Sequence, residues 1–61
     1  MKFQHYKGGI YELITYATHT ETNEKLVIYS DDSNNVYARP YNMFFEDVIV
    51  DGKEIPRFKK L

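Results

Sequence analysis

Apolar and polar positions alternate along this chain in short runs that are separated by turn-forming residues. Residues 1–6 and 10–19 have the β-branched and aromatic content of strands, and the glycines between them favour a tight turn. In residues 10–19 both alternating faces are mixed, which predicts a bent strand whose two halves bury different sides. A helix is the alternative there, but the apolar residues do not recur at helical spacing.

The same pattern continues beyond a polar turn at residues 20–25. Residues 26–29 and 36–39 predict a hairpin around residues 30–35, whose sequence SDDSNN is the strongest turn signal in the chain. Asp and Asn favour this loop because their side chains bond to their own backbone and tolerate left-handed conformations.

The last third of the chain predicts a helical turn followed by closing strands. Residues 41–46 combine bulky apolar side chains with Asn42, which is able to cap one turn of helix. Residues 47–50 and 53–58 predict two strands around Asp51-Gly52, a dipeptide that favours a tight hairpin turn.

These elements predict one all-β domain over residues 1–61. A long bent strand, a hairpin, a helical turn and a closing strand are typical of a small SH3-like barrel of about five strands. A chain of this size buries only ~60% of the surface that its unfolded form exposes. The chain has no cysteine, so its six Tyr and four Phe, rather than disulfides, must supply the stability of the core.

Charge and hydropathy narrow the classes of partner. The formal net charge of -1 gives no overall basic field for nucleic acid or for anionic membranes. No apolar run approaches the ~20 residues of a membrane span. The first residues also lack the apolar region of a signal peptide. We therefore expect a soluble, cytoplasmic protein that does not enter a membrane.

Most of the chain resembles one small bacterial family. The segments HYKGG, HTET, RP, MF, DGK and PRF occur in order and cover nearly the whole chain. In these segments the chain is similar to the family called domain of unknown function 1653. The resemblance implies a small β domain without an assigned activity or ligand. The chain departs from the family pattern in the SDDSNN loop and at Tyr37, where a bulkier aromatic residue is expected, so the departures bear on specificity carried by loops and not on the fold.

Two histidines and one carboxylate are the candidates for a metal site. His19 and Glu21 project to the same side of an extended segment, and His5 precedes the glycine turn, so the three are candidates for the site of a metal-dependent hydrolase. The alternative is that His19 bonds the turn backbone and Glu21 is solvated. The chain has no zinc-protease spacing and no serine elbow, and its core is small. We predict no catalytic residue, no metal and no cofactor.

Arg39 is the strongest candidate for ligand binding. It ends a strand, and its planar fork suits a carboxylate or a phosphate. The alternative is an internal ion pair with Glu46 or Glu12.

Arg57 has the same two interpretations. It is a candidate for binding an anionic partner, or for an ion pair with Glu21 or Asp47.

The tyrosines near turns and strand ends are candidates for the lining of a groove, although most of them are needed in so small a core. The candidate ligand-binding residues are His5, Lys7, Tyr11, His19, Glu21, Tyr29, Arg39 and Arg57. The first hypothesis is a non-enzymatic binding module for a protein or peptide, and the alternatives are RNA binding through a basic and aromatic patch and the hydrolase above. A homo-oligomer is a further hypothesis, formed through an edge strand near Pro56 or through the N-terminal lead-in.

Overall fold

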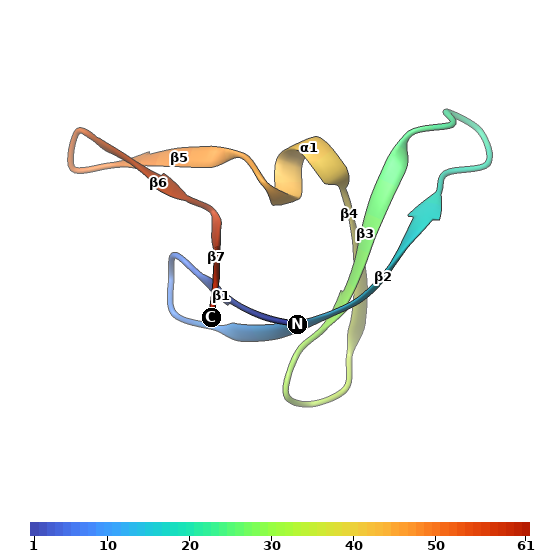
Figure 1. Ribbon diagram of the computed structural model, residues 1–61, viewed down its shortest axis with the longest axis horizontal. Helices are drawn as coiled ribbons and strands as arrows, with labels where there is room; N and C mark the ends of the chain where they lie inside the picture. Colours follow the sequence, from blue (N-terminus) through green and yellow to red (C-terminus); the bar gives the residue numbers. More distant parts are fainter.

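Seven strands and one short helix follow one another along the chain, and the computed structural model describes all of residues 1–61. The elements are β1 Lys2–His5, β2 Ile10–Thr18, β3 Lys25–Ser30, β4 Val36–Pro40, α1 Tyr41–Phe44, β5 Asp47–Val50, β6 Lys53–Pro56 and β7 Phe58–Lys60. Five strands form an antiparallel sheet in the order β4-β3-β2-β1-β7, and β5 and β6 form a separate hairpin. In Figure 1 this hairpin extends away from the sheet, and α1 lies between it and β4.

The mostly β class is confirmed, but the sheet does not close into the expected barrel. β4 and β7 each pair with one neighbour only, so both are free edges of an open sheet. The single closing strand predicted over residues 53–58 is also wrong. The strand is interrupted at Arg57, whose backbone N–H donates to the Glu46 carbonyl at 3.0 Å. As a result β6 pairs with β5, whereas β7 crosses to β1.

The turns follow the local signals in the sequence. Three of the connections within the five-stranded sheet contain a residue at positive φ, namely Gly8 at 111°, Asn23 at 60° and Asn34 at 64°. Such a residue ends the loops of three or more residues that join antiparallel strands. In the fourth hairpin Asp51 and Gly52 have φ of 52° and 77°, as a tight primed turn requires.

The first two strands agree with one prediction and correct another. β2 is bent, because its register against β3 shifts between Leu13 and Thr15. The N-terminal lead-in is not a free edge, since β1 pairs with β2 on one side and with β7 on the other. Pairing between molecules through the lead-in is therefore excluded by this topology.

The core is a small cluster of rings that α1 closes. The buried residues are Phe3, Val27, Tyr29, Phe44 and Phe58. Phe44 stacks on Phe58 with ring centroids 4.1 Å apart, and it meets Phe3 edge-on at 5.3 Å. The expected Asn42 cap is wrong, because α1 follows Pro40 without any side-chain cap. Burial of Phe44 therefore holds this helical turn in place.

No helix of the structure is long enough to cross a membrane. α1 is the single helix of the structure, and it is far shorter than a bilayer crossing requires.

Candidate binding site

Strand register gathers aromatic side chains and one arginine on the same side of the sheet. Opposed residues of an antiparallel pair share a face, and His5 lies opposite Phe58, while Tyr29 lies opposite Tyr37. We call this surface the aromatic face, and it consists of His5, Tyr11, Tyr29, Tyr37, Arg39 and Phe58. Its rings touch throughout, with centroids 5.5 Å apart for Tyr11 and Tyr29 and 4.9 Å apart for His5 and Phe58.

The aromatic face has a buried floor and an accessible rim. Tyr29 and Phe58 form the floor and are only 5% and 4% exposed. Tyr11 is half-buried above them. Tyr37 is 42% exposed and lies at the end of the face, where its hydroxyl donates to Asp31 Oδ2 at 2.8 Å.

Arg39 is a half-buried cation without a carboxylate partner. Its Nε donates to the Tyr29 hydroxyl at 3.3 Å, and its guanidinium carbon lies 5.9 Å from the centroid of the Phe58 ring. The structure has two ion pairs, and neither includes Arg39. The expected partners are engaged elsewhere, since Glu12 binds the amino terminus and Glu46 binds another arginine. The prediction of an internal ion pair for Arg39 is therefore wrong.

Arg57 forms the ion pair that was expected for Arg39. Its Nη2 donates to Glu46 Oε1 at 3.1 Å, so the expected pairing with Glu21 or Asp47 is wrong. The Nε of Arg57 is buried and has no hydrogen-bond partner. The contacts of Arg57 with Glu46 therefore hold the interruption between β6 and β7 in place, and the Nε–H of Arg57 donates no hydrogen bond.

His5 reports a positive local field beside the aromatic face. Its Nδ1 accepts the backbone N–H of Lys7 at 3.1 Å, which leaves the proton of the neutral ring on Nε2. Burial lowers the pKa of His5, and the charges of Arg39, Arg57 and Lys7 lower it further. Three cations are thus close enough to His5 to affect its charge, and each of them would attract an anion bound beside His5.

His19 and Glu21 do not join this site. The Nδ1 of His19 accepts the backbone N–H of Glu21 at 3.1 Å and that of Thr22 at 3.4 Å, as expected of a histidine that holds a turn. This turn follows β2, whereas His5 lies before it, at the other end of the strand. No group of three or more metal-ligating side chains occurs in the structure. The residues proposed for a metal site are therefore not brought together.

A second pair of exposed tyrosines has an internal partner. The ammonium of Lys25 lies 4.5 Å from the centroid of the Tyr16 ring and 4.6 Å from that of Tyr41. A cation held over two ring faces is attracted by both of them. The rings of Tyr16 and Tyr41 are thereby occupied, whereas no cation lies over the tyrosine rings of the aromatic face.

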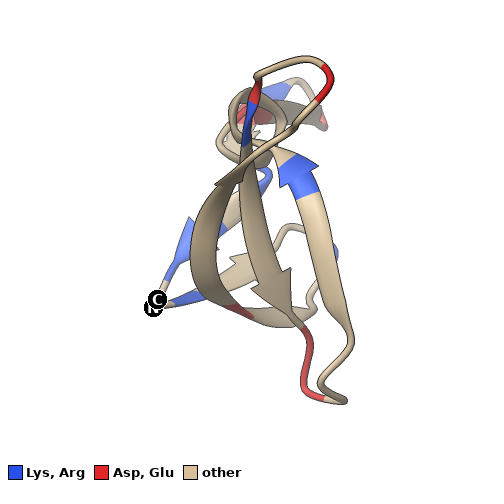
Figure 2. Cartoon of the chain, turned by 90° about the vertical axis from the view of Figure 1, so that its right-hand side faces the viewer, with Lys and Arg blue, Asp and Glu red and all other residues tan.

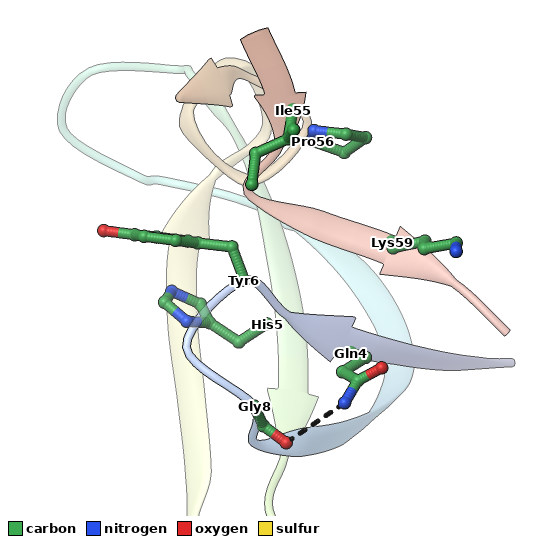
Figure 3. A pocket seen from close by; sticks show the side chains of 7 residues that line it. All are labelled: Gln4, His5, Tyr6, Gly8, Ile55, Pro56 and Lys59. Carbon is green, nitrogen blue, oxygen red and sulfur yellow. Dashed lines mark hydrogen bonds between the residues drawn. The ribbon is translucent and has the colours of Figure 1, made fainter. Parts of the chain in front are cut away.

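The largest pocket lies beside the aromatic face and not on it. It has a volume of about 460 Å³ and separates the β5–β6 hairpin from β1 and the turn that follows (Figure 3). Its lining is Gln4, His5, Tyr6, Gly8, Ile55, Pro56 and Lys59. Of the tyrosines near turns and strand ends, Tyr6 lines this pocket, whereas Tyr11 and Tyr29 pack on one another and do not. A smaller pocket of about 290 Å³ includes Tyr11, but each pocket of the structure is lined by one tyrosine, so the tyrosines do not form a groove together.

The sequence indicated most of the aromatic face. Tyr37 was among the tyrosines considered for a groove but not among the candidate ligand-binding residues, and Phe58 was noted only as part of a shared segment. Both join the face through strand pairing, Phe58 through the contact of β7 with β1. The charged side chains, which stand out in a sequence, were easier to find than the rings beneath them.

Fold and site together define a small, mostly β domain with an aromatic face flanked by cations. The model of the family described as "Protein of unknown function (DUF1653)" matches residues 1–60, and the chain belongs to this family. No curated protein and no solved structure matches the chain.

Proposed function

We propose that this protein is a non-enzymatic binding module that takes a peptide segment of another protein and seats an acidic side chain on Arg39. The observation that carries the proposal is the state of Arg39, a half-buried cation without a carboxylate partner. The Tyr29 hydroxyl and the Phe58 ring orient its guanidinium. An oriented arginine fork binds a carboxylate through charge-assisted hydrogen bonds and loses little freedom when it does so.

The charges around Arg39 also favour an anionic ligand. Arg39, Arg57 and Lys7 all lower the pKa of His5, which means that their fields add at this position. A carboxylate beside His5 would relieve the repulsion among these like charges. A basic ligand would increase it.

The rings of the aromatic face favour a peptide as the carrier of that acidic group. Tyr37 and Tyr11 offer apolar surface next to the cation, and tyrosine and arginine are enriched at the centres of protein interfaces. Their rings are already packed, so a ligand can bind without ordering them.

Single-stranded RNA is the second candidate, because bases stack on exposed tyrosines. Two observations make it less favourable. Asp31 accepts a hydrogen bond from the hydroxyl of Tyr37, so a negative charge lies beside the most exposed ring of the face and would repel a phosphate. The net charge of the chain is -1, so a phosphate backbone would meet no extended basic surface. The hydrolase alternative loses its main support, since His19 holds a turn.

Two further expectations belong to this proposal. We infer a distant relationship to SH3-like domains from the order of the elements, a long bent strand, a hairpin and a helical turn, although the sheet is open. We also infer a cytoplasmic location from the composition of the chain.

Selection from a phage-displayed library of random peptides tests the proposed function. We expect the wild-type protein to enrich peptides with Asp or Glu. Arg39→Gln should lose this enrichment. Lys53→Gln removes the same charge from the exposed β5–β6 hairpin and should retain it. Enrichment without acidic residues, or enrichment that survives Arg39→Gln, would contradict the proposal.

Random single-stranded RNA provides the comparison of ligand classes. Its binding is measured at about 50 and about 200 mM salt, because binding through phosphates weakens steeply over this range. We expect no saturable binding. Tight, salt-sensitive binding that requires Arg39 would replace the peptide by RNA in the proposal.

A further inference from the structure

The pairing of β4 with β3 determines which backbone groups of β4 remain free. The hairpin between them closes with the N–H of Asp31 donating to the Asn35 carbonyl at 3.1 Å. Hydrogen-bonded and non-bonded pairs alternate along an antiparallel ladder. Counting from this closing pair along the register, Tyr37 and Arg39 are hydrogen-bonded to β3.

The backbone groups of the alternate residues of β4 point the other way. Val36 and Ala38 occupy non-bonded pairs, so their N–H and C=O groups point away from β3. Pro40 occupies the same kind of pair, where the absence of an N–H breaks no hydrogen bond of the sheet. No other strand pairs with β4. Its outer edge therefore offers a short row of free donors and acceptors that ends at Pro40.

The two edges of the sheet differ in their protection. β7 has three residues, two of which are Lys59 and Lys60. Short length and lysine are features that keep edge strands from pairing with other chains. β4 has no lysine, its only proline is its last residue, and Val36 is 62% exposed beside its free edge. β4 is thus the edge that is open to another strand.

Charge gives the β4 edge a direction. Arg39 is the second-last residue of β4, and Asp31 lies in the loop between β3 and β4. In Figure 2 the arrowhead of the outer strand is blue, and the hairpin loop at the opposite end has a red segment. Asp31 accepts hydrogen bonds from Asn35 and from the Tyr37 hydroxyl, and they lower its pKa, so it is an anion at neutral pH. An acidic side chain on an added strand would be attracted at Arg39 and repelled beside Tyr37.

Building on the proposed function, we propose that the peptide binds as an added strand antiparallel to β4, with its acidic residue opposite Arg39 and an apolar residue opposite Tyr37. Its backbone would bond to the free N–H and C=O groups of Val36 and Ala38. Its side chains opposite Arg39 and Tyr37 would stand on the aromatic face. Peptides that add to a sheet edge use this division, with affinity from the backbone and specificity from alternate side chains.

The antiparallel direction fixes the order of the recognition motif. All strand pairs of this protein are antiparallel, and this pairing is slightly more stable per residue than the parallel one. The residue opposite Arg39 must then precede the residue opposite Tyr37 by two positions. The motif is an acidic residue, any residue, and an apolar residue, in this order.

The test uses a synthetic peptide Gly-Thr-Glu-Thr-Val-Thr-Gly with blocked ends, added at millimolar concentration to the ¹⁵N-labelled protein. Amide hydrogen exchange is read residue by residue. We expect the N–H groups of Val36 and Ala38 to exchange at least several-fold more slowly with the peptide present. Those of Tyr37 and Arg39, which already bond to β3, should change little.

Two N-methylated forms of the peptide provide the matched control. In the added strand the threonine between Glu and Val lies opposite Ala38 and donates its N–H to β4, so N-methylation there should abolish binding. The N–H of the valine points away from β4, and its N-methylation should be tolerated. Ala38→Pro removes one free donor from the protein and should weaken binding, whereas Ala38→Ser should not. The methylated peptides decide the matter if the proline variant does not fold.

The outcomes separate this inference from the proposed function. If signals of the aromatic face move while Val36 and Ala38 keep their exchange rates, the peptide lies on the face, the added strand is excluded and the proposed function stands. If no signal moves at millimolar peptide, both are overturned. Protection of Val36 and Ala38 without peptide, increasing with protein concentration, would make a second copy of the chain the occupant and overturn the inference.

Discussion

The Nε of Arg39 donates a hydrogen bond to the Tyr29 hydroxyl, diagonally across the neighbouring strands β4 and β3, at 3.3 Å. Tyr29 is 5% exposed, so its hydroxyl is fixed by the packing of its ring. The bond uses one donor of the guanidinium and leaves the fork of Nη groups for a ligand. The relationship makes Arg39 a positioned cation rather than a freely moving surface charge.

Removal of the Tyr29 hydroxyl tests whether this positioning matters. Tyr29→Phe keeps the ring in the core and removes the acceptor. A hydrogen bond of this kind contributes about 0.5–1.5 kcal/mol, so we expect the affinity for an acidic peptide to fall roughly two- to tenfold. Calorimetric titration with a peptide from the library selection measures this, and the denaturation curve of the variant serves as the control for folding. Unchanged affinity in a folded variant would show that Arg39 needs no positioning.

The local part of this fold could be predicted from the sequence. Asp51-Gly52 and the SDDSNN loop predict their turns because the preference for positive φ and the Asx hydrogen bonds belong to the residues themselves. The bend in β2 was also evident from its mixed faces. The turn role of His19 is local in the same sense, since its partners lie two and three residues away.

The non-local part could not be predicted. The break at Arg57 and the pairing of β7 with β1 depend on contacts between the two ends of the chain, which no short window contains. The partner of Arg39 was misassigned for the same reason. Glu46 is near in sequence but is drawn to Arg57 by the break between β6 and β7, and Glu12 is drawn to the amino terminus.

His5 gives a prediction about pH. Its pKa is lowered in the free protein by burial and by three cations, so it is neutral at pH 7. A carboxylate on Arg39 offsets part of this field, which raises the pKa of His5 on binding. The complex then takes up a proton, and affinity increases as pH falls from about 6.5 towards the range near 4.3, where the ligand's own Glu is protonated.

Titration of the imidazole signals by NMR measures this effect. The titration midpoint of His5 should rise when the peptide is saturating. A lowered or unchanged midpoint for His5 would place the carboxylate away from Arg39.

Phe44 gives a prediction about stability. It is fully buried, and it stacks on Phe58 while α1 has no side-chain cap. Phe44→Ala should lower the free energy of unfolding by about 3–5 kcal/mol, which is a large part of the stability of so small a domain. Chemical denaturation measures the change, and Phe44→Leu, which retains more of the volume, should lose clearly less. Equal losses would mean that α1 is not held by this contact.

The ionised Asp31 predicts how the stability of the folded protein depends on pH. Hydrogen bonds from Asn35 and from the Tyr37 hydroxyl lower its pKa in the folded protein. A carboxylate with a lowered pKa stabilises the folded state at pH values above its ordinary pKa of about 3.9. This contribution is lost as the pH falls through the folded-state pKa. Asp31→Asn should melt at a lower temperature than wild type at neutral pH.

The difference in melting temperature should shrink as pH falls below about 4, since the wild-type carboxylate is then protonated as well. Tyr37→Phe, which removes one of the donors, should act in the same direction and less strongly. A difference in melting temperature that is constant from neutral to acid pH would contradict the role of the ionised Asp31.

Binding of the acidic side chain to Arg39 is tested by recording the Nε–H signal of Arg39 in the ¹⁵N spectrum while an acidic peptide from the library selection is added. We predict that this signal shifts and saturates together with the backbone signals of β4. A control peptide with Gln in place of its acidic residue should leave it in place. If the acidic peptide binds and the Arg39 signal does not move, or moves equally with the control, Arg39 is not the seat of the carboxylate and the proposed function is wrong.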